Sequence, residues 1–211
     1  MPRPHFYLLL ALLAAYGLSA STGWLEARLD GWAYYQDVLI GIGINIILAV
    51  SLNLVNGYTG QFSLGHAGFM SVGAYLAAAV SLFLGPRLLG EEGGTAFQQG
   101  LMFLAALTAG GLGAALAAVA VGIPSLRLKG DYLALVTLGF GEIIRVIFQN
   151  VEVLGGALGL NGIPAYTSLF WVLAVGAVTV FTVTSLVHST YGRGFLATHD
   201  DEVASEAVGL N

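Results

Sequence analysis

Six uninterrupted apolar runs constrain this sequence more than any other feature, because each is long enough to cross a bilayer as a helix. The runs are continuous and lack the short alternating pattern of barrel strands, so helices are favoured over a transmembrane β-barrel. We therefore predict an all-α fold, a polytopic transmembrane helical bundle with about six spans. The predicted spans are residues 6–25, 38–55, 67–84, 100–123, 131–149 and 168–188.

Composition supports an integral membrane protein and excludes several other classes. The 211 residues are 57% hydrophobic and 9% charged, with a mean hydropathy of +0.83, whereas soluble domains are about 25% charged. A net charge of -5 with scattered basic residues gives no nucleic-acid-binding pattern. The absence of cysteine excludes disulfides, thiolate metal sites and a cysteine nucleophile. The four histidines lack metal-ligand spacing, so we predict no metal site and no cofactor.

The first and third runs carry signals at their ends. A basic start, an apolar core and the small residues Ser19 and Ala20 also describe a signal peptide. Because Leu18 is a poor residue three positions before a cut after Ala20, we expect an uncleaved first span.

Pro86 is expected to end the third span, since an X-Pro bond disfavours helix at the preceding residue. Residues 87–99 are then expected to form a loop.

A glycine-rich polar segment, residues 53–75, spans the junction between the second and third runs. Irregular backbone is tolerated at membrane depth only where protein or a water-filled cavity satisfies its amides, so the segment indicates a transport pathway. The alternative is a polar surface turn followed by a helix whose glycines let neighbours pack closely. For His66, a hydrogen-bonded packing role is favoured over a proton relay. The residues predicted to line the pathway are Gly57, Tyr58, Gln61, Ser63, Gly65 and His66.

Two later runs have features that bear on packing. Small residues recur at three- and four-residue steps in the fourth run, which predicts close helix contacts and a central position in the bundle. The fifth run carries Glu142 and Arg145, which are three residues apart and therefore adjoin on one helical face. Charges inside a span face protein or water, so the pair either lines a pathway or is structural. The structural pair is favoured, because each residue already has its partner.

The last segment, residues 189–211, is polar and predicted to lie in the cytoplasm. Asp200 as N-cap and Gly209 as terminator would delimit a short amphipathic helix with apolar residues such as Val203 on one side. More basic residues lie in the loops that are inside when the N-terminus is cytoplasmic than in the loops that are outside. The inside residues are Arg3, Arg127, Lys129 and Arg193, against Arg28 and Arg87 outside.

With these residues laid out, the sequence resembles the LivM-type permease subunit of bacterial ABC importers for branched-chain amino acids. The resemblance runs in collinear order over about residues 35–211. Residues 53–75 resemble the block that LivM-type and LivH-type permeases share. The motifs more specific to the LivM type are residues 126–134 and 137–145, and residues 155–164 and 192–211 also fit the family.

The resemblance implies a two-permease pore in the bacterial plasma (inner) membrane. Its expected partners are a LivH-type permease subunit, two cytoplasmic ATPase subunits and a periplasmic solute-binding protein. A helix that only rests on the lipid surface is the alternative role for the tail. The residues implied to contact the ATPase are Asp200, Asp201, Glu202, Val203, Ala204, Glu206, Ala207 and Gly209.

Two departures from the family pattern stand out. Residues 197–199 read Ala-Thr-His where the family usually has Ala-Ile-Arg, which removes a basic residue beside the coupling helix. Family members also continue with further spans, whereas this sequence stops at Asn211. We therefore expect a fragment, a split gene or a truncated product, with the rest of the family domain missing beyond residue 211.

The leading hypothesis is an ATP-driven permease for branched-chain or similar apolar amino acids, without enzymatic activity of its own. The sequence has no Gly-x-x-x-x-Gly-Lys-Ser/Thr loop, so ATP hydrolysis is expected on separate subunits. Three alternatives remain: a permease of the same family for urea or short amides, a secondary carrier or channel, and a non-transporting assembly subunit. A membrane enzyme is disfavoured because no nucleophile-base arrangement lies within the spans.

Overall fold

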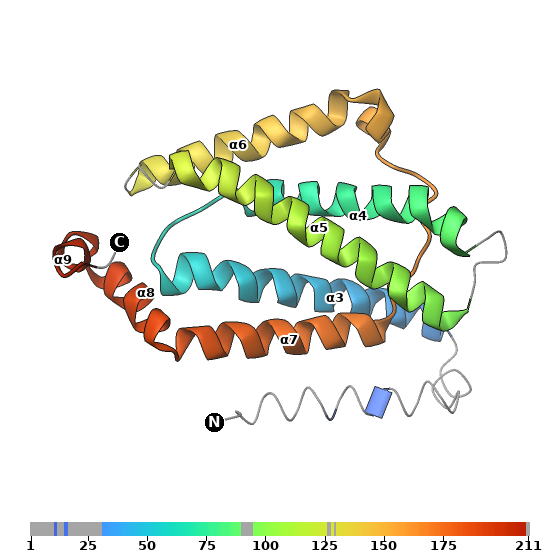
Figure 1. Ribbon diagram of the computed structural model, residues 1–211, viewed down its shortest axis with the longest axis horizontal. Helices are drawn as coiled ribbons and strands as arrows, with labels where there is room; N and C mark the ends of the chain where they lie inside the picture. The colour runs from blue at the N-terminus through green and yellow to red at the C-terminus, as the bar shows by residue number, and fades with distance from the viewer. Residues whose placement is uncertain are drawn as a thin grey trace. The chain divides into compact units, whose positions relative to one another are not determined.

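The computed structural model describes residues 11, 15, 16, 31–89, 95–125, 128 and 130–209, and the regular structure of these residues is helical (Figure 1). The predicted polytopic helical fold is confirmed. The predicted first span, residues 6–25, lies outside the described residues except for 11, 15 and 16. Among the described residues, five helices are long and apolar enough to span a membrane: α3 (Trp32–Asn53) with its extension η1 (Leu54–Tyr58), α4 (His66–Leu89), α5 (Ala96–Ser125), α6 (Asp131–Asn150) and α7 (Leu169–Val187).

Several span ends differ from the predictions. The expectation that Pro86 ends the third span is wrong, because α4 contains Pro86 and continues to Leu89. Membrane helices tolerate such a proline because neighbouring groups satisfy the freed backbone carbonyl. The expected loop is also shorter, since α5 begins at Ala96. Thr95 and Gln98 form a reciprocal capping box there: the Thr95 amide donates to Gln98 Oε1 at 2.8 Å, and the Gln98 amide donates to Thr95 Oγ1 at 3.4 Å.

The chain divides into two compact units. Unit 1 comprises residues 1–61 and 167–211, and unit 2 comprises residues 62–166. In unit 1, α7 packs along α3 through small residues: a side chain at Gly43 would collide with Val172, and one at Gly176 would lie 3.7 Å from Ile47 Cγ1. Two short helices, α8 (Thr190–Asp200) and α9 (Glu202–Ala207), follow α7.

Unit 2 is built around α4, which packs against both α5 and α6. A Cβ atom at Gly110 of α5 would lie 2.6 Å from the carbonyl oxygen of Gly73 in α4, so the two backbones touch. The expectation that the fourth span is central in the bundle stays a prediction. Within unit 2, a Cβ added at Gly111 or Gly122 of α5 would meet nothing within 4 Å, and α4 is the helix that packs against both of the others.

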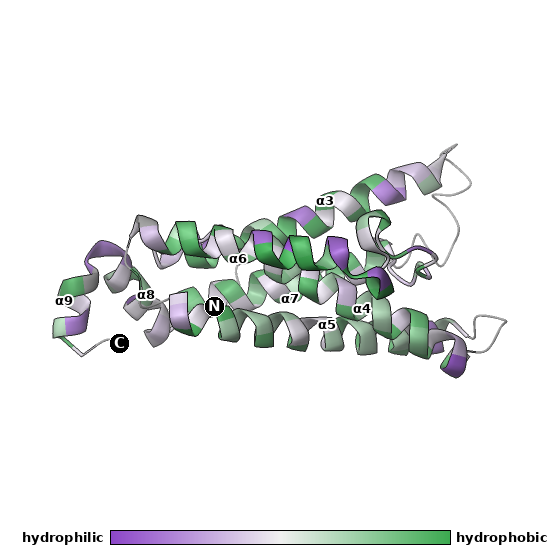
Figure 2. Ribbon diagram, turned by 90° about the horizontal axis from the view of Figure 1, so that it is seen from above, coloured by the Kyte–Doolittle hydropathy of each residue, from purple (hydrophilic) through white to green (hydrophobic). Residues whose placement is uncertain are grey.

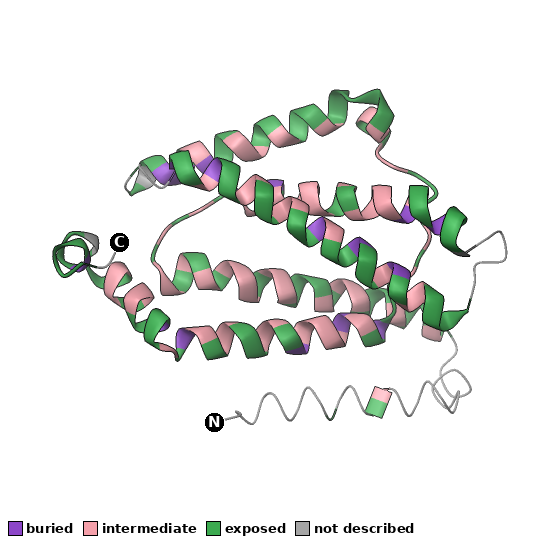
Figure 3. Ribbon diagram, viewed as in Figure 1, coloured by how far each residue is buried: buried purple, intermediate pink, exposed green. Residues whose placement is uncertain are grey.

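The long helices expose apolar surface (Figures 2 and 3). On the outer side of α5, Leu112 is 67% exposed and Leu116 is 72% exposed. A soluble protein rarely exposes continuous apolar helix faces of this kind, whereas lipid covers them at no cost. The chain is therefore a multi-pass membrane protein.

The contact between Gly73 and Gly110 generates a prediction with an adjacent control. Gly110→Ala places a methyl group against the Gly73 carbonyl and should lower the free energy of unfolding by about 1–3 kcal/mol, the usual range for overpacking. Gly111→Ala, next in sequence, enters open space and should be neutral or slightly stabilising. Thermal unfolding in mild detergent measures both variants. Equal midpoints would show that the α4–α5 contact is looser than described.

Candidate functional site

Regular α-helix ends inside the glycine-rich segment. After Asn53 the helix widens into the π-helix η1, and residues 59–65 are not helical. A side chain at Gly57 would collide with the Asn53 side chain, and Gly60 has φ +67°, a conformation that favours glycine. Short π-helical turns inside α-helices are frequent at functional sites. The sequence therefore places an interrupted helix at the end of a membrane span.

The second half of the segment is fixed to α6. The Leu64 amide donates to the hydroxyl oxygen of Thr137, which is buried on α6, at 3.0 Å. A Cβ at Gly65 would lie 3.2 Å from the Thr137 carbonyl oxygen, and one at Gly68 would lie 3.0 Å from the Cα of Gly141. A side chain at either position would press on the backbone of α6, so α4 starts in close contact with that backbone.

The residues predicted to line the pathway divide between the two units. Gly57, Tyr58 and Gln61 belong to the end of unit 1, and residues 63, 65 and 66 begin unit 2. Gly57 is exposed, Gly65 is buried and the other four are half-buried. Within unit 2 the structure brings the start of α4 together with α6. The role of the six residues in a pathway stays a prediction.

Helix α8 contacts the non-helical segment within unit 1. A Cβ at Gly60 would lie 2.8 Å from His199 Cδ2 and 3.3 Å from the His199 Cα. His199 also lies 3.5 Å from Asp200, between Nδ1 and Oδ1. The helix itself starts at the cap Ser189, whose hydroxyl accepts a hydrogen bond from the Gly192 amide. His199, one of the two residues at which the sequence departs from the pattern that the resemblance implied, thus lies against the interrupted helix.

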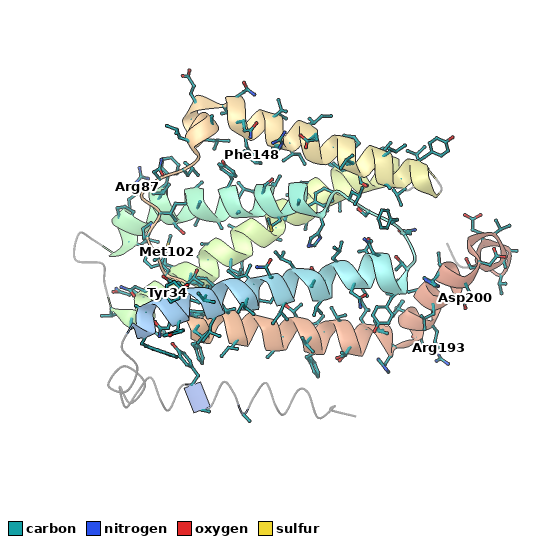
Figure 4. The ribbon with its side chains drawn as sticks, turned by 180° about the vertical axis from the view of Figure 1, so that it is seen from behind. Tyr34, Arg87, Met102, Phe148, Arg193 and Asp200 are labelled. Carbon is teal, nitrogen blue, oxygen red and sulfur yellow. The ribbon has the colours of Figure 1, made fainter. Side chains whose placement is uncertain are left out.

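The terminal amphipathic helix is present as α9, but its cap was placed one residue too early. Asp201 is the N-cap: its Oδ1 accepts from the amides of Val203 and Ala204 at 2.9 and 3.0 Å. Asp200 is instead the last residue of α8, because the backbone becomes extended only at Asp201. The helix stops before Gly209, which has φ +90°, as expected for a terminator. Figure 4 labels Asp200 at this end of the chain.

The expected apolar side of α9 is open. Val203 is 69% exposed and Val208 is 83% exposed, while Ser205 is buried. Val203 therefore presents an exposed apolar side chain on the capped helix, and Val208 presents another directly after its end.

The Glu142–Arg145 ion pair is formed as predicted, with 2.8 Å between Arg145 Nε and Glu142 Oε2. The Arg145 side chain is 63% exposed and that of Glu142 is 55% exposed. On the packed side of the same helix lies Phe148, which Figure 4 labels. Its ring stacks on that of Tyr75 of α4, with ring centroids 4.2 Å apart. Because both side chains of the Glu142–Arg145 ion pair are exposed, the ion pair does not contribute to helix packing inside unit 2.

Sequence reasoning missed Thr137 as the residue that anchors the interrupted helix. A signal existed, because Thr137 and Gly141 are four residues apart and share a helical face, and Phe148 follows seven residues after Gly141. A polar residue on such a face must find a partner within the protein. Nothing in the sequence identified the Leu64 amide as that partner.

Comparison with known proteins identifies the family. Residues 34–211 match the family described as the branched-chain amino acid transport system permease component. The chain belongs to this family. It is 32% identical over 210 residues to the high-affinity branched-chain amino acid transport system permease protein LivM of Salmonella typhimurium, covering 83% of this chain and 46% of that protein.

Two further relatives give the same result. Identity to the LivM protein of Escherichia coli is 32% over 203 residues, covering 80% of this chain and 44% of the relative. The probable LivM protein of Methanocaldococcus jannaschii is 26% identical over 205 residues, which cover 82% of this chain and 58% of that protein. The chain spans about half the length of the curated relatives it matches. No solved structure matches it.

The hydrogen bond from Leu64 to Thr137 can be removed without changing side-chain volume. Thr137→Val should lower the free energy of unfolding by about 1–3 kcal/mol, because it leaves a donor without its partner, while Thr137→Ser keeps the hydroxyl and should retain more of the stability. The unfolding midpoint in detergent compares the two variants. A valine variant at least as stable as the serine variant would contradict the anchoring role.

Proposed function

We propose that this chain forms membrane-spanning permease structure in an ATP-driven importer that moves branched-chain or similar apolar amino acids into the cytoplasm. The observation that carries the proposal is the family match over residues 34–211, together with five membrane-spanning helices in the described residues. The substrate class follows the names of the relatives, which are branched-chain amino acid permeases. Urea and short amides are the alternative substrates.

The proposed complex contains a LivH-type permease subunit, two cytoplasmic ATPase subunits and a periplasmic solute-binding protein. Residues 1–188 form the permease region in the bacterial inner membrane, with the N-terminus in the cytoplasm. Residues 189–211 form the cytoplasmic segment that couples to the ATPase. The exposed Val203 of α9 and Val208 just after it support this assignment, because a capped helix with exposed apolar side chains suits docking in a protein groove.

The interrupted helix supports a pathway role for Gly57, Tyr58, Gln61, Ser63, Gly65 and His66. Residues 59–65 are not helical, and in a membrane their amides need protein or water as partners. Water at this position would provide a polar route for a solute. The same segment touches α8 at Gly60, so displacement of α8 and α9 by an ATPase would reach the interrupted helix directly.

Transport by the reconstituted complex tests the proposal. Uptake of radiolabelled leucine into proteoliposomes should require ATP, the ATPase subunits and the binding protein. Gly65→Leu should reduce uptake at least about tenfold, because the new side chain meets the Thr137 backbone, and His66→Ala should reduce it with less effect on stability. ATP-independent uptake would support a secondary carrier instead. Unchanged uptake in both variants would remove the pathway assignment.

The contact between Gly60 and His199 generates a prediction about coupling. Gly60→Ala places a methyl group 2.8 Å from the His199 ring and strains a backbone with positive φ, so fewer substrate molecules should be imported per ATP hydrolysed. Adding His199→Ala should restore part of the ratio by removing the collision. Gly122→Ala, which enters open space on α5, is the control. An unchanged ratio in Gly60→Ala would contradict transmission through this contact.

A further inference from the structure

Helix α6 ends well before the helix that it packs against. Gly68 of α4 lies against Gly141 of α6. Seven residues further along both helices, Tyr75 stacks on Phe148, so the two helices run parallel and keep the same register. Helix α6 ends at Asn150, two residues after this stack, whereas α4 continues well beyond that point.

Helix α5 runs in the opposite direction and serves as a ruler for unit 2. A Cβ at Gly110 of α5 would lie 3.1 Å from the Cβ of Ala77 in α4. One turn later in α5, Ala114 lies against Gly73, which is one turn earlier in α4. The two helices are therefore antiparallel, and positions on α5 can be compared with positions on α4.

Apolar surface on α5 and α4 indicates which part of unit 2 lies in the membrane. Exposed apolar side chains line α5 from Leu101 to Ile123, with no charged residue between them. This stretch is about 33 Å long, close to the thickness of about 30 Å of a bilayer's hydrocarbon core. Because Leu101 precedes Gly110 by nine residues, it lies at about the same depth in the bilayer as Gly85 of α4. Phe83 of α4, which is 66% exposed, gives the same result.

A non-helical segment occupies the depth that α6 does not reach. Residues 159–166, which we call the strap, are neither helix nor strand. At one end of the strap, a Cβ at Gly159 would lie 3.8 Å from the hydroxyl oxygen of Tyr75. At the other end, the hydroxyl oxygen of Tyr166 lies 3.0 Å from the position of a Cβ at Gly85. The strap therefore runs beside the last part of α4, within the depth of the membrane (Figure 1).

The backbone of the strap is polar at this depth. Among the described residues, the amides of residues 160–163 have no hydrogen-bond acceptor. Glu152, two residues after the end of α6, adds an exposed carboxylate nearby. Irregular backbone and charged groups at membrane depth need protein or water as partners. Lipid is therefore a poor occupant of the space beside the strap.

The apolar side chains next to the strap do not meet this demand. Val153, Leu158 and Ile163 are exposed, and none of them can accept a hydrogen bond. They can border lipid, whereas the amides of residues 160–163 need a polar partner. A Cβ at Gly162 would meet nothing within 4 Å, which leaves open space directly beside the backbone.

We propose that water reaches the strap at membrane depth and that the strap lines an aqueous entrance for the solute. The entrance lies beside the end of α4, whereas the interrupted helix precedes its start. Water offers acceptors to the strap amides and donors to the Glu152 carboxylate, so it satisfies both kinds of group. The presence of water is argued from the structure of unit 2 alone, and the role as an entrance rests on the proposed function.

Cysteine labelling tests the depth and the water together, because the natural chain contains no cysteine. In the assembled transporter in lipid nanodiscs, Asn161→Cys should react with a membrane-impermeant maleimide at least about a hundredfold faster than Phe83→Cys, because the reactive thiolate forms in water and not in lipid. Asn161 is suitable because its side-chain nitrogen donates to the Gly159 carbonyl oxygen at 3.4 Å, close to the end of the strap that contacts Tyr75. Phe83 is the matched control on the lipid-exposed side of α4.

Either of two labelling results would overturn the proposal. Equally fast reaction at positions 161 and 83 would show that this part of α4 lies outside the membrane. Slow reaction at position 161 would show that protein or lipid covers the strap. Complete labelling of both variants after denaturation confirms that each cysteine is present, so a slow reaction reports the environment of the thiol.

Transport then tests the role as an entrance. Leucine uptake by the Asn161→Cys transporter, measured before and after labelling, should fall to background once a bulky maleimide occupies the space beside the strap. Fast labelling with unchanged uptake would overturn this role. If the wild-type complex does not take up leucine, the proposed function fails, and the labelling rates still decide whether water reaches the strap.

Discussion

The structure depends on backbone contact between glycine-bearing helices. In a bilayer, the hydrophobic effect does not drive helices together, so they associate through close packing and hydrogen bonds. Helix α4 uses both: Gly73 meets Gly110 of α5, Gly68 meets Gly141 of α6, and the Leu64 amide just before α4 bonds to Thr137. These contacts lie on different sides of α4, and together they fix its start and its middle. The rest of unit 2 is arranged around this helix.

This anchoring gives the interrupted helix its significance. Residues 59–65 join η1 to α4 along the chain, and their far end is held by Thr137 while Gly60 lies against His199. A segment without regular helical hydrogen bonds, whose one end is bonded to Thr137 and whose other end contacts α8, can change conformation without unfolding a membrane-spanning helix. Such a conformational change is what the proposed function requires, because an ATPase that displaces α8 would have to alter the interrupted helix.

Much of the fold could be predicted from the sequence, because continuous apolar runs are sufficient to locate membrane-spanning helices. The ends of the helices were harder to predict. Pro86 was expected to end a helix, but α4 contains it, because a membrane helix tolerates a proline. The Thr95–Gln98 capping box that starts α5 was overlooked. Periodicity could not show that Gly110 is packed while Gly111 is open, since this depends on which helix lies alongside. For the site, the Glu142–Arg145 pair follows from spacing alone. The bond between Leu64 and Thr137 joins residues far apart in sequence, and no local pattern reveals it.

The most direct test of this account is hydrogen–deuterium exchange of the protein in lipid nanodiscs, resolved over residues 54–80. If α4 is anchored and the preceding segment is not helical, amides 69–80 should exchange at least about a hundredfold more slowly than amides 60–63. Uniformly slow exchange across the whole range would instead indicate one continuous helix and contradict the account.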